Sequence, residues 1–315
     1  MMQMKIDSSL AFRVFKRIVK PFIGTGIGRS RPIGAIYRYI ASNLIIPKEE
    51  ATIYVNGYQM FTHSDKKGIE GIAHELLLTG TYEEYTSSVF KQYVKSGMVV
   101  LDIGANIGYF TLLAASLVGD SGKVFAFEPE LKNYSLLSKN IEINGYKNVI
   151  AVPKAVSDKV GELQLFLDRE ESGGHSLFKA SAIRGNENSI EAITVNTTSI
   201  DEFFGDSGQV VDIIKIDIEG AEVMALNGMQ NTINKSKNIK LFSEFTPHKL
   251  KNAGNSAEGY WDLIMRSGFA YIYLINSHVK KLEKADLDAI LKYCKGNKFR
   301  QAGHVNLLCS KSPVF

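Results

Sequence analysis

Residues 99–110, VVLDIGANIGYF, combine an apolar run, a glycine turn and the start of a helix. Gly104 and Gly108 allow a tight turn and a close approach of a ligand to the backbone. The helix N-terminus that follows carries partial positive charge. However, Asp102 precedes the turn, where its charge would oppose the two phosphates of a dinucleotide, and the glycine spacing is not G-x-G-x-x-G. Asp102 therefore favours a cationic ligand such as S-adenosylmethionine (SAM), whose sulfonium and α-ammonium groups are both positive. The alternative is a plain strand-to-helix corner with a capping aspartate.

A second acidic residue follows the next strand-like segment. Glu128 ends the run VFAFE and lies about 20 residues after Gly108, a spacing at which an acidic side chain accepts hydrogen bonds from both ribose hydroxyls. Both SAM and NAD contain this ribose, so Glu128 indicates an adenosyl ligand without choosing between the two.

Further acidic residues follow two later strands. The segment KIDIEGAE, residues 215–222, places Asp217 and Glu219 after a buried strand, and Lys215 alternates onto the side of Asp217. The segment LFSEFTPH ends its strand near Glu244 and continues to His248. Asp217, Glu219, Glu244 and His248 could therefore line a pocket for a second substrate beside the ligand crevice.

Two other interpretations of these acids remain open. Glu219 and Glu222 could merely complement a helix N-terminus. Asp217, Glu219 and Glu244 could hold a divalent metal, but their spacing is not diagnostic, so no metal is predicted.

The elements that must position these residues alternate between strand and helix. The expected strands are 98–103, 123–128, 148–153, 210–217, 238–245, 269–276 and 304–310, and the expected helices are 70–96, 107–118, 131–144, one opening at Glu219, and 257–266. This alternation is typical of an α/β fold with a parallel sheet, whose ligands bind at the carboxyl ends of the strands. The last strand is expected to pair antiparallel at the sheet edge. Residues 161–198 interrupt the rhythm as a β-hairpin insertion, with His175 in its loop as either a substrate lid or an inert surface residue.

Taken together, LDIGANIGYFT, FEPE and KIDIEGAE resemble the motifs of the FkbM family of SAM-dependent methyltransferases, over about residues 80–245. The resemblance implies a Rossmann-like class I methyltransferase sheet of seven strands, mostly parallel with the last antiparallel, and SAM as cofactor. It also implies methyl transfer, usually to a hydroxyl oxygen of a sugar, glycolipid or other natural product. A neutral hydroxyl must lose its proton, so a carboxylate or histidine is expected within hydrogen-bond reach. We therefore predict Asp217, Glu219, Glu244 and His248 as the catalytic residues. The cofactor-binding residues that it implies are Asp102, Gly104, Ala105, Asn106, Gly108, Glu128, Pro129, Ser157, Asp158 and Asp217.

Other functions fit less well. A nucleic-acid N-methyltransferase usually carries an Asn/Asp-Pro-Pro-aromatic turn where this chain has DIEG, so nucleic acid is a disfavoured partner. A non-catalytic SAM-binding module would not need the acids at 217, 219 and 244. An NAD oxidoreductase is disfavoured by Asp102 and by the glycine spacing.

The N-terminal part differs from the rest in charge. Residues 1–48 contain nine Lys or Arg against one acidic residue, Asp7, and residues 8–22 have the pattern of a basic amphipathic helix. This helix either caps the main domain or contacts an anionic membrane or a lipid-linked acceptor. Asn56-Gly57 predicts a hairpin turn. We therefore expect an extension over residues 1–69 and a methyltransferase domain over residues 70–315.

Composition sets the expected compartment. Two cysteines, Cys294 and Cys309, are too few for a disulfide framework, and no run of 18 apolar residues is present. The expected location is the cytoplasm, and peripheral membrane contact through the basic helix is the alternative to its capping role. The oligomeric state is left open.

Overall fold

The computed structural model describes residues 51–62, 72, 75–76, 79–168, 174–182, 190–296 and 303–315. The chain forms two compact units, residues 1–83 with 142–145, and residues 84–141 with 146–315. The predicted basic helix at residues 8–22 lies outside the described residues. Within the described part of the chain, every helix is too short or too polar to cross a bilayer.

The first unit contains a two-stranded antiparallel hairpin. Strand β1 (Ala51–Val55) pairs with β2 (Tyr58–Thr62), and Asn56 and Gly57 both have positive φ, at 50° and 93°. Two consecutive residues with positive φ are typical of a type I′ turn, whose twist matches that of the strands. The hairpin predicted from Asn56-Gly57 is confirmed.

The second unit is built on an eight-stranded sheet. In spatial order its strands are β12 (Lys281–Lys284), β11 (Tyr271–Asn276), β13 (Val305–Ser310), β10 (Lys240–Phe245), β9 (Ile213–Ile216), β3 (Val99–Ile103), β4 (Lys123–Phe127) and β5 (Val149–Val152). Strands β10, β9, β3, β4 and β5 are parallel, and β13 is antiparallel to both its neighbours. The chain order reverses between β3 and β9, so their carboxyl ends form the switch point at which such sheets bind ligands.

This topology confirms the α/β class and the antiparallel last strand, and it corrects two details. The sheet has eight strands instead of seven, because the short charged segment KLEK forms β12 without any apolar alternation. Strand β13 lies inside the sheet, between β10 and β11, and not at its edge. All but two of its residues are apolar, and four of its last five positions are buried, as expected for a strand covered on both faces.

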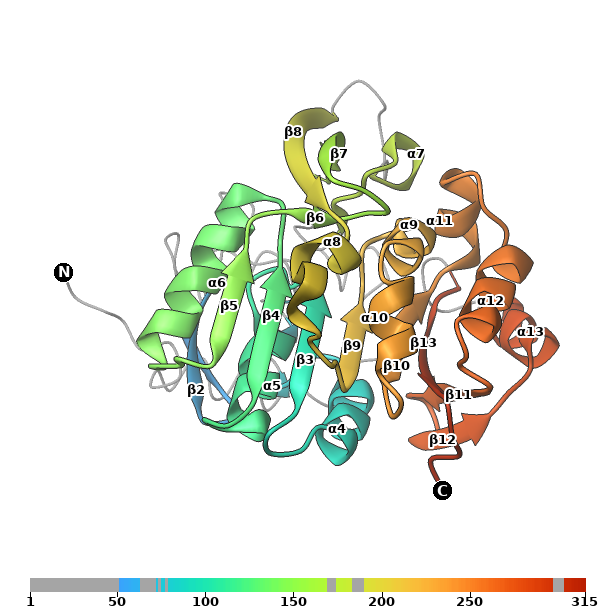
Figure 1. Cartoon of the computed structure of the whole chain (residues 1–315), viewed down its shortest axis with the longest axis horizontal. Helices are drawn as coiled ribbons and strands as arrows, with labels where there is room; N and C mark the ends of the chain where they lie inside the picture. Colours follow the sequence, from blue (N-terminus) through green and yellow to red (C-terminus); the bar gives the residue numbers. More distant parts are fainter. Residues whose placement is uncertain are drawn as a thin grey trace, which may run out of the picture. The chain divides into compact units, whose positions relative to one another are not determined.

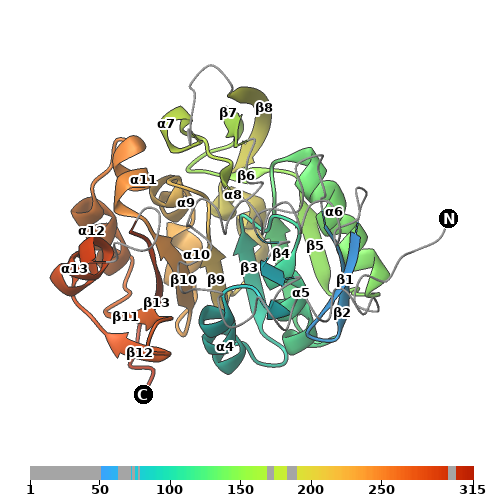
Figure 2. The same ribbon diagram turned by 180° about the vertical axis from the view of Figure 1, so that it is seen from behind.

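Helices cover both faces of the sheet. Alternate strand residues such as Leu101, Phe125 and Ile214 belong to one large apolar core, which also contains buried side chains from the helices on that face. Those helices are α8 (Ile200–Phe204), α9 (Glu222–Asn227), α10 (Gln230–Lys235), α11 (Pro247–Asn252), α12 (Ala257–Arg266) and α13 (Leu287–Gly296). Figure 1 shows α8 and α10 in front of the central strands. Helices α4 (Glu84–Tyr93) and α5 (Tyr109–Val118) pack on the opposite face, which is turned toward the viewer in Figure 2.

Two helices differ from the expected ones. Helix α9 opens at Glu222 instead of Glu219, because Glu219 and Gly220 both have positive φ, at 55° and 107°. Helix α4 covers the end of the expected helix 70–96. Residues 72, 75, 76 and 79 are also helical, but the chain bends at residues 80–83, where Gly80 has a φ of 77°, so the expected helix is interrupted. Positive φ is incompatible with a right-handed helix.

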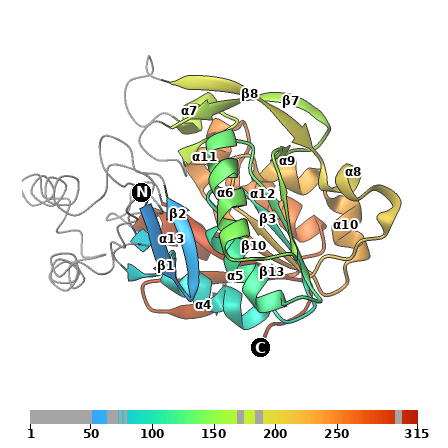
Figure 3. The ribbon, with the colours of Figure 1, turned by 90° about the vertical axis from the view of Figure 1, so that its left-hand side faces the viewer.

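The insertion forms its own three-stranded sheet. Strands β7 (Gly161–Leu167) and β8 (Glu191–Thr198) pair antiparallel, and β6 (Ala155–Val156) adds parallel to β8. These strands and the short α7 (Lys179–Ala182) lie beyond the carboxyl ends of β3 and β4, at the top of Figures 1 and 3. The expected hairpin insertion is therefore present, and it stands over the edge of the sheet where ligands are expected.

Candidate active site

The glycine turn after β3 is packed tightly against the loop after β9. Gly104 has a φ of 83°, and a Cβ there would overlap the carbonyl oxygen of Asp217. The amides of Gly104 and Ala105 both donate to the carbonyl of Phe127, each at 3.0 Å. The Asp217 amide in turn donates to the Ile103 carbonyl at 3.0 Å. The ends of β3, β4 and β9 are thus held together, and only glycine fits at position 104.

The second glycine of the turn contacts α6 (Leu131–Ile143). Gly108 has a φ of 97°, and a Cβ there would lie 2.7 Å from the Leu137 side chain. Asn140 donates from Nδ2 to the Ile107 carbonyl at 2.8 Å. These contacts hold the turn at the start of α5.

Asp102 is a buried carboxylate in which only one of the two oxygens is hydrogen-bonded. It is 2% exposed, and its Oδ2 accepts a hydrogen bond from the Thr111 hydroxyl at 2.6 Å. Its Oδ1 is buried and has no hydrogen-bond partner within the described residues. Burial raises the pKa of Asp102, and the nearby charge of Lys215 opposes that effect. A buried acceptor without a partner is costly, so a cationic or N–H-donating ligand fits here.

Glu128 links the glycine turn to the end of β4. Its Oε2 accepts the amide of Asn106 at 2.8 Å, and its Oε1 accepts the amide of Glu130 at 3.0 Å. It is 6% exposed, and burial raises its pKa to about 7. Each carboxylate oxygen can accept a second hydrogen bond, so Glu128 can also receive ribose hydroxyls. Pro129, the next residue, is half-buried.

The expected adenine-edge residues lie after β6. Ser157 is buried, and its hydroxyl donates to Oδ1 of the exposed Asp158 at 3.0 Å. The Ser157 amide donates to the carbonyl of Thr198, at the end of β8. This hydrogen bond connects the loop after β6 to the insertion.

Asp217 forms the expected pair with Lys215. Their Nζ–Oδ2 distance is 3.0 Å, and Lys215 lies opposite Asp102 in the β3–β9 register. The Lys215 ammonium also lies 4.5 Å from the centre of the Phe110 ring. Burial acts to raise the pKa of Asp217, but the charge and hydrogen bond of Lys215, with the charge of Lys249, hold it below its ordinary value. The charge of Lys215 therefore stabilises the ionised forms of both Asp102 and Asp217.

The other predicted acids converge with two basic residues that the sequence reasoning missed. Lys249 pairs with Glu219, and its Nζ lies 3.9 Å from Glu244 Oε2. His304 places Nε2 3.9 Å from Glu244 Oε1. The carboxylates of Asp217, Glu219 and Glu244 offer oxygens that all lie within 4.8 Å of one another. We call Asp217, Glu219, Glu244, Lys249 and His304 the charged cluster.

His248 and His175 lie in other settings. His248 belongs to α11 (Pro247–Asn252) and is exposed, whereas the next residue, Lys249, is buried. His175 accepts the amide of Asp168 on Nδ1 at 3.0 Å and so closes the loop of the insertion. The insertion also reaches the charged cluster, since the Ser176 hydroxyl donates to the Glu219 carbonyl at 2.7 Å.

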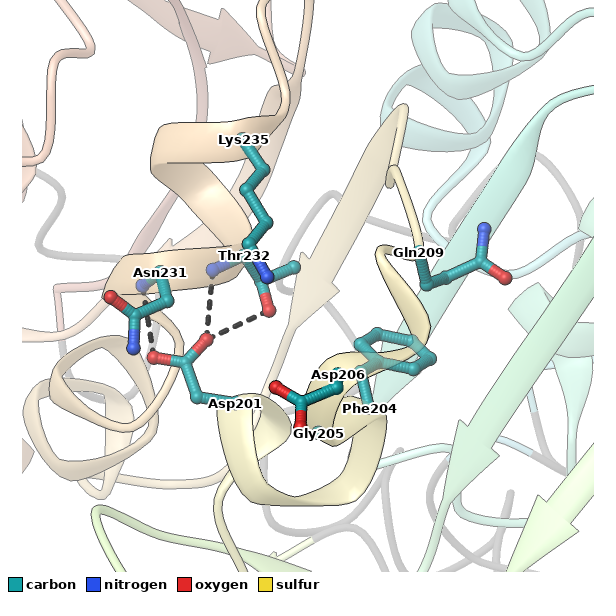
Figure 4. A pocket seen from close by; sticks show the side chains of 8 residues that line it. All are labelled: Asp201, Phe204, Gly205, Asp206, Gln209, Asn231, Thr232 and Lys235. Carbon is teal, nitrogen blue, oxygen red and sulfur yellow. Dashed lines mark hydrogen bonds between the residues drawn. The ribbon is translucent and has the colours of Figure 1, made fainter.

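A separate cavity of about 230 Å³ lies between α8 and α10. Its lining residues are Asp201, Phe204, Gly205, Asp206, Gln209, Asn231, Thr232 and Lys235, and none of the residues of the site above is among them (Figure 4). Asp201 accepts the amides of Asn231 at 2.9 Å and Thr232 at 2.8 Å, and the Thr232 hydroxyl at 2.8 Å. These bonds cap the start of α10, which is a structural role.

Comparison with known proteins places the chain in a family. The family model for the methyltransferase FkbM domain matches residues 102–274, more than half of the chain. Methyltransferase sdnD of Sordaria araneosa is 28% identical over 159 residues, which cover 42% of this chain and 61% of that protein. Hexuronic acid methyltransferase AglP of Haloferax volcanii is 29% identical over 141 residues, which cover 43% of this chain and 51% of that protein. The chain thus spans about half to three-fifths of these curated relatives.

A solved SAM-dependent O-methyltransferase from Thermotoga maritima aligns over 85% of this chain and 87% of its own, with a TM-score of 0.39 and 14% identity. The family match covers both the glycine turn with its buried Asp102 and the loops after β9 and β10. The chain belongs to the FkbM methyltransferase family, and its cofactor is S-adenosylmethionine.

Proposed function

We propose that this protein transfers a methyl group from SAM to a hydroxyl oxygen of a sugar, a glycolipid or another small-molecule natural product. The observation that carries this proposal is the charged cluster, in which three acidic side chains and a histidine converge beside the glycine turn. Carboxylates bind hydroxyl hydrogens well, and such a group can also accept the proton that a hydroxyl must lose.

The cofactor side is assigned to the residues around the turn. We assign Asp102, through its buried Oδ1, to the positive end of the methionyl moiety, and Glu128 to the ribose. Gly104, Ala105, Asn106 and Gly108 supply the backbone that faces this ligand. When bound, SAM supplies an electrophilic methyl group. The protein must hold the acceptor oxygen in line with it, at about 3 Å.

On the acceptor side, different residues orient the acceptor and remove its proton. Because Lys215 keeps the pKa of Asp217 low, Asp217 is a weak base and is better suited to orienting the acceptor. Glu244 and His304 lie together on neighbouring strand ends, so we assign proton removal to this pair. Glu219 is held by Lys249 and by the insertion through Ser176, and we assign it to binding of the acceptor.

The acceptor class is supported by the named relatives. AglP is a hexuronic acid methyltransferase, which favours a sugar acceptor. The basic segment at residues 1–48 would bring the enzyme to an anionic membrane or a lipid-linked acceptor from the cytoplasm. Removal of residues 1–20 is then expected to weaken binding to anionic liposomes, and unchanged binding would favour a capping role for this segment.

The direct test is transfer of labelled methyl from SAM into an extract of the source organism, followed by identification of the product. We expect label in a methyl ether, lost in Glu244→Gln while S-adenosylhomocysteine (SAH) still binds. Label in nucleic acid would support the N-methyltransferase alternative. Binding of SAH without transfer in any extract would support a non-catalytic SAM-binding module.

A further inference from the structure

The three acids of the charged cluster need positive charge close by. Asp217, Glu219 and Glu244 bring oxygens within 4.8 Å of one another, and Glu219 is only 8% exposed. Buried carboxylates at such distances repel one another and are retained only when they are paired or bind a cation. An arrangement of three carboxylates around one point is also one that Mg²⁺ or Mn²⁺ can use. The question is which cation occupies this point.

Lys249 supplies a covalently attached cation there. It pairs with Glu219 and lies 3.9 Å from Glu244, so its ammonium contacts two of the three carboxylates. Its charge also lowers the pKa of the third, Asp217. Lys249 is 9% exposed, as expected for an ammonium held among buried partners and not directed into solvent.

The backbone fixes Lys249 at this position. Gly220 has a φ of 107°, and a Cβ there would lie 2.9 Å from the Lys249 carbonyl oxygen. The loop after β9 can therefore approach α11 closely only because residue 220 is glycine. Ser176 also holds this loop, through its hydrogen bond to the Glu219 carbonyl. Glu219 and Lys249 are thus brought together by the fold and not by side-chain flexibility alone.

We propose that Lys249 is the built-in cation of the charged cluster, taking the place that a divalent metal would otherwise fill. Lys249 is then a positioning residue that orients Glu219 and Glu244, and the acceptor side works without a metal. A divalent ion would have to displace the ammonium and would be repelled by it. The role in orienting an acceptor rests on the proposed function, whereas the exclusion of metal does not.

The first test measures Mn²⁺ binding to the full-length protein without SAM, by the electron paramagnetic resonance signal of free Mn²⁺. We expect no stoichiometric site in the wild type. Lys249→Met removes the ammonium and keeps an apolar chain of similar length. It should bind one Mn²⁺ per chain, at least about tenfold more tightly than any residual, non-stoichiometric binding to the wild type. Lys249→Arg keeps the charge and should behave as the wild type. In the double variant Lys249→Met, Glu244→Gln the new site should be lost.

A matched control removes a lysine from an exposed ion pair. Lys280 contacts Glu84 at 3.0 Å on the surface, and Lys280→Met should leave Mn²⁺ binding unchanged. If Lys249→Met does not fold, as judged by circular dichroism, Lys249→Gln is titrated in its place. A wild type that binds Mn²⁺ stoichiometrically, or a folded Lys249→Met or Lys249→Gln variant that gains no Mn²⁺ site, would overturn the proposal.

A second test uses methyl transfer once an acceptor is known. Wild-type activity should be unchanged by EDTA, and Lys249→Met should raise KM for the acceptor with little change in the affinity for SAH. Lys249→Arg should restore most of the acceptor affinity, which a purely structural role would not predict. Loss of wild-type activity in EDTA, restored by Mg²⁺ or Mn²⁺, would refute the proposal. Absence of any transfer would count against the proposed function only.

Discussion

Binding of SAH should be coupled to ionisation of Glu128. Burial raises the pKa of this carboxyl from 4.5 to about 7 in the free protein. Ribose hydroxyls that donate to the carboxylate favour its ionised form, so the ligand should lower this pKa and release a proton on binding. The affinity for SAH is therefore expected to rise as the pH increases toward and through 7.

The size of the effect follows from the fraction of Glu128 that is already ionised before binding. With a pKa of about 7, that fraction is about 9% at pH 6.0 and about 76% at pH 7.5, so the affinity should increase about eightfold, or about 1.2 kcal/mol. The same pKa shift has the opposite pH dependence for folding of the free protein. Because the folded state favours protonated Glu128, the contribution of Glu128 to the free energy of unfolding is complete below pH 4.5. It is lost as the pH rises to about 7, a change of about 3 kcal/mol.

Isothermal titration calorimetry at pH 6.0 and 7.5, in two buffers of different ionisation enthalpy, measures both the affinity and the released protons. Glu128→Gln is the control, because it keeps an acceptor oxygen and cannot ionise. The amino group of SAH titrates alike with both proteins, so the difference between their pH profiles isolates Glu128. Equal profiles for wild type and Glu128→Gln, with equal proton release, would refute the coupling.

Three further outcomes follow from the contacts of buried groups. Burial raises the pKa of Glu222 to about 7, so ionisation of this side chain destabilises the folded state above that pH. Glu222→Gln should therefore raise the free energy of unfolding by up to about 3 kcal/mol near pH 8 and leave it unchanged near pH 4. Urea titrations at both pH values measure this difference, and equal shifts at the two pH values would contradict it. Gly104→Ala should weaken SAH binding and should lower the free energy of unfolding by more than Gly208→Ala, for which we expect a loss of about 1–2 kcal/mol. Both glycines have positive φ, but only a Cβ at position 104 would meet the backbone of the loop after β9. Similar losses of stability in thermal unfolding would argue against this close approach. Asp201→Ala should cost about 1–2 kcal/mol of stability without changing SAH affinity, and a change in affinity would connect the α8–α10 cavity with the active site.

The elements with strong local patterns could be predicted from the sequence. Strands β3, β4, β9 and β10 are short apolar runs, and their boundaries agree with the expected ones within three residues. Strand β12 could not be found in this way, because KLEK has no apolar alternation and is a strand only through its pairing with β11. The interior place of β13 also depends on pairing between segments far apart in the chain, which periodicity does not report.

The acidic residues of the charged cluster could be predicted from the sequence, whereas its basic residues, Lys249 and His304, could not. Asp217, Glu219 and Glu244 follow strands, and parallel strands bring their carboxyl ends together. His248 was predicted for the site and Lys249 was not, and no helix was expected directly after β10. The segment is a helix that starts with Pro247, and neighbouring side chains on a helix point about 100° apart, so Lys249 faces inward and His248 outward. His304 joins the cluster through β13, whose position only the assembled sheet defines.

The interior position of β13 also has a consequence for folding during synthesis. Within the described sheet, β11 and β12 connect to the other strands only through β13, and β10 has no second neighbour until β13 arrives. About 60 residues separate the end of β10 from the start of β13, which the ribosome adds in about 3 to 12 s. During that interval the nascent chain exposes an apolar strand edge at β10 beside an unattached β11–β12 hairpin. Because the edge closes only when residues 305–310 emerge, a pause in translation before them would prolong the stage at which this protein is most prone to aggregate.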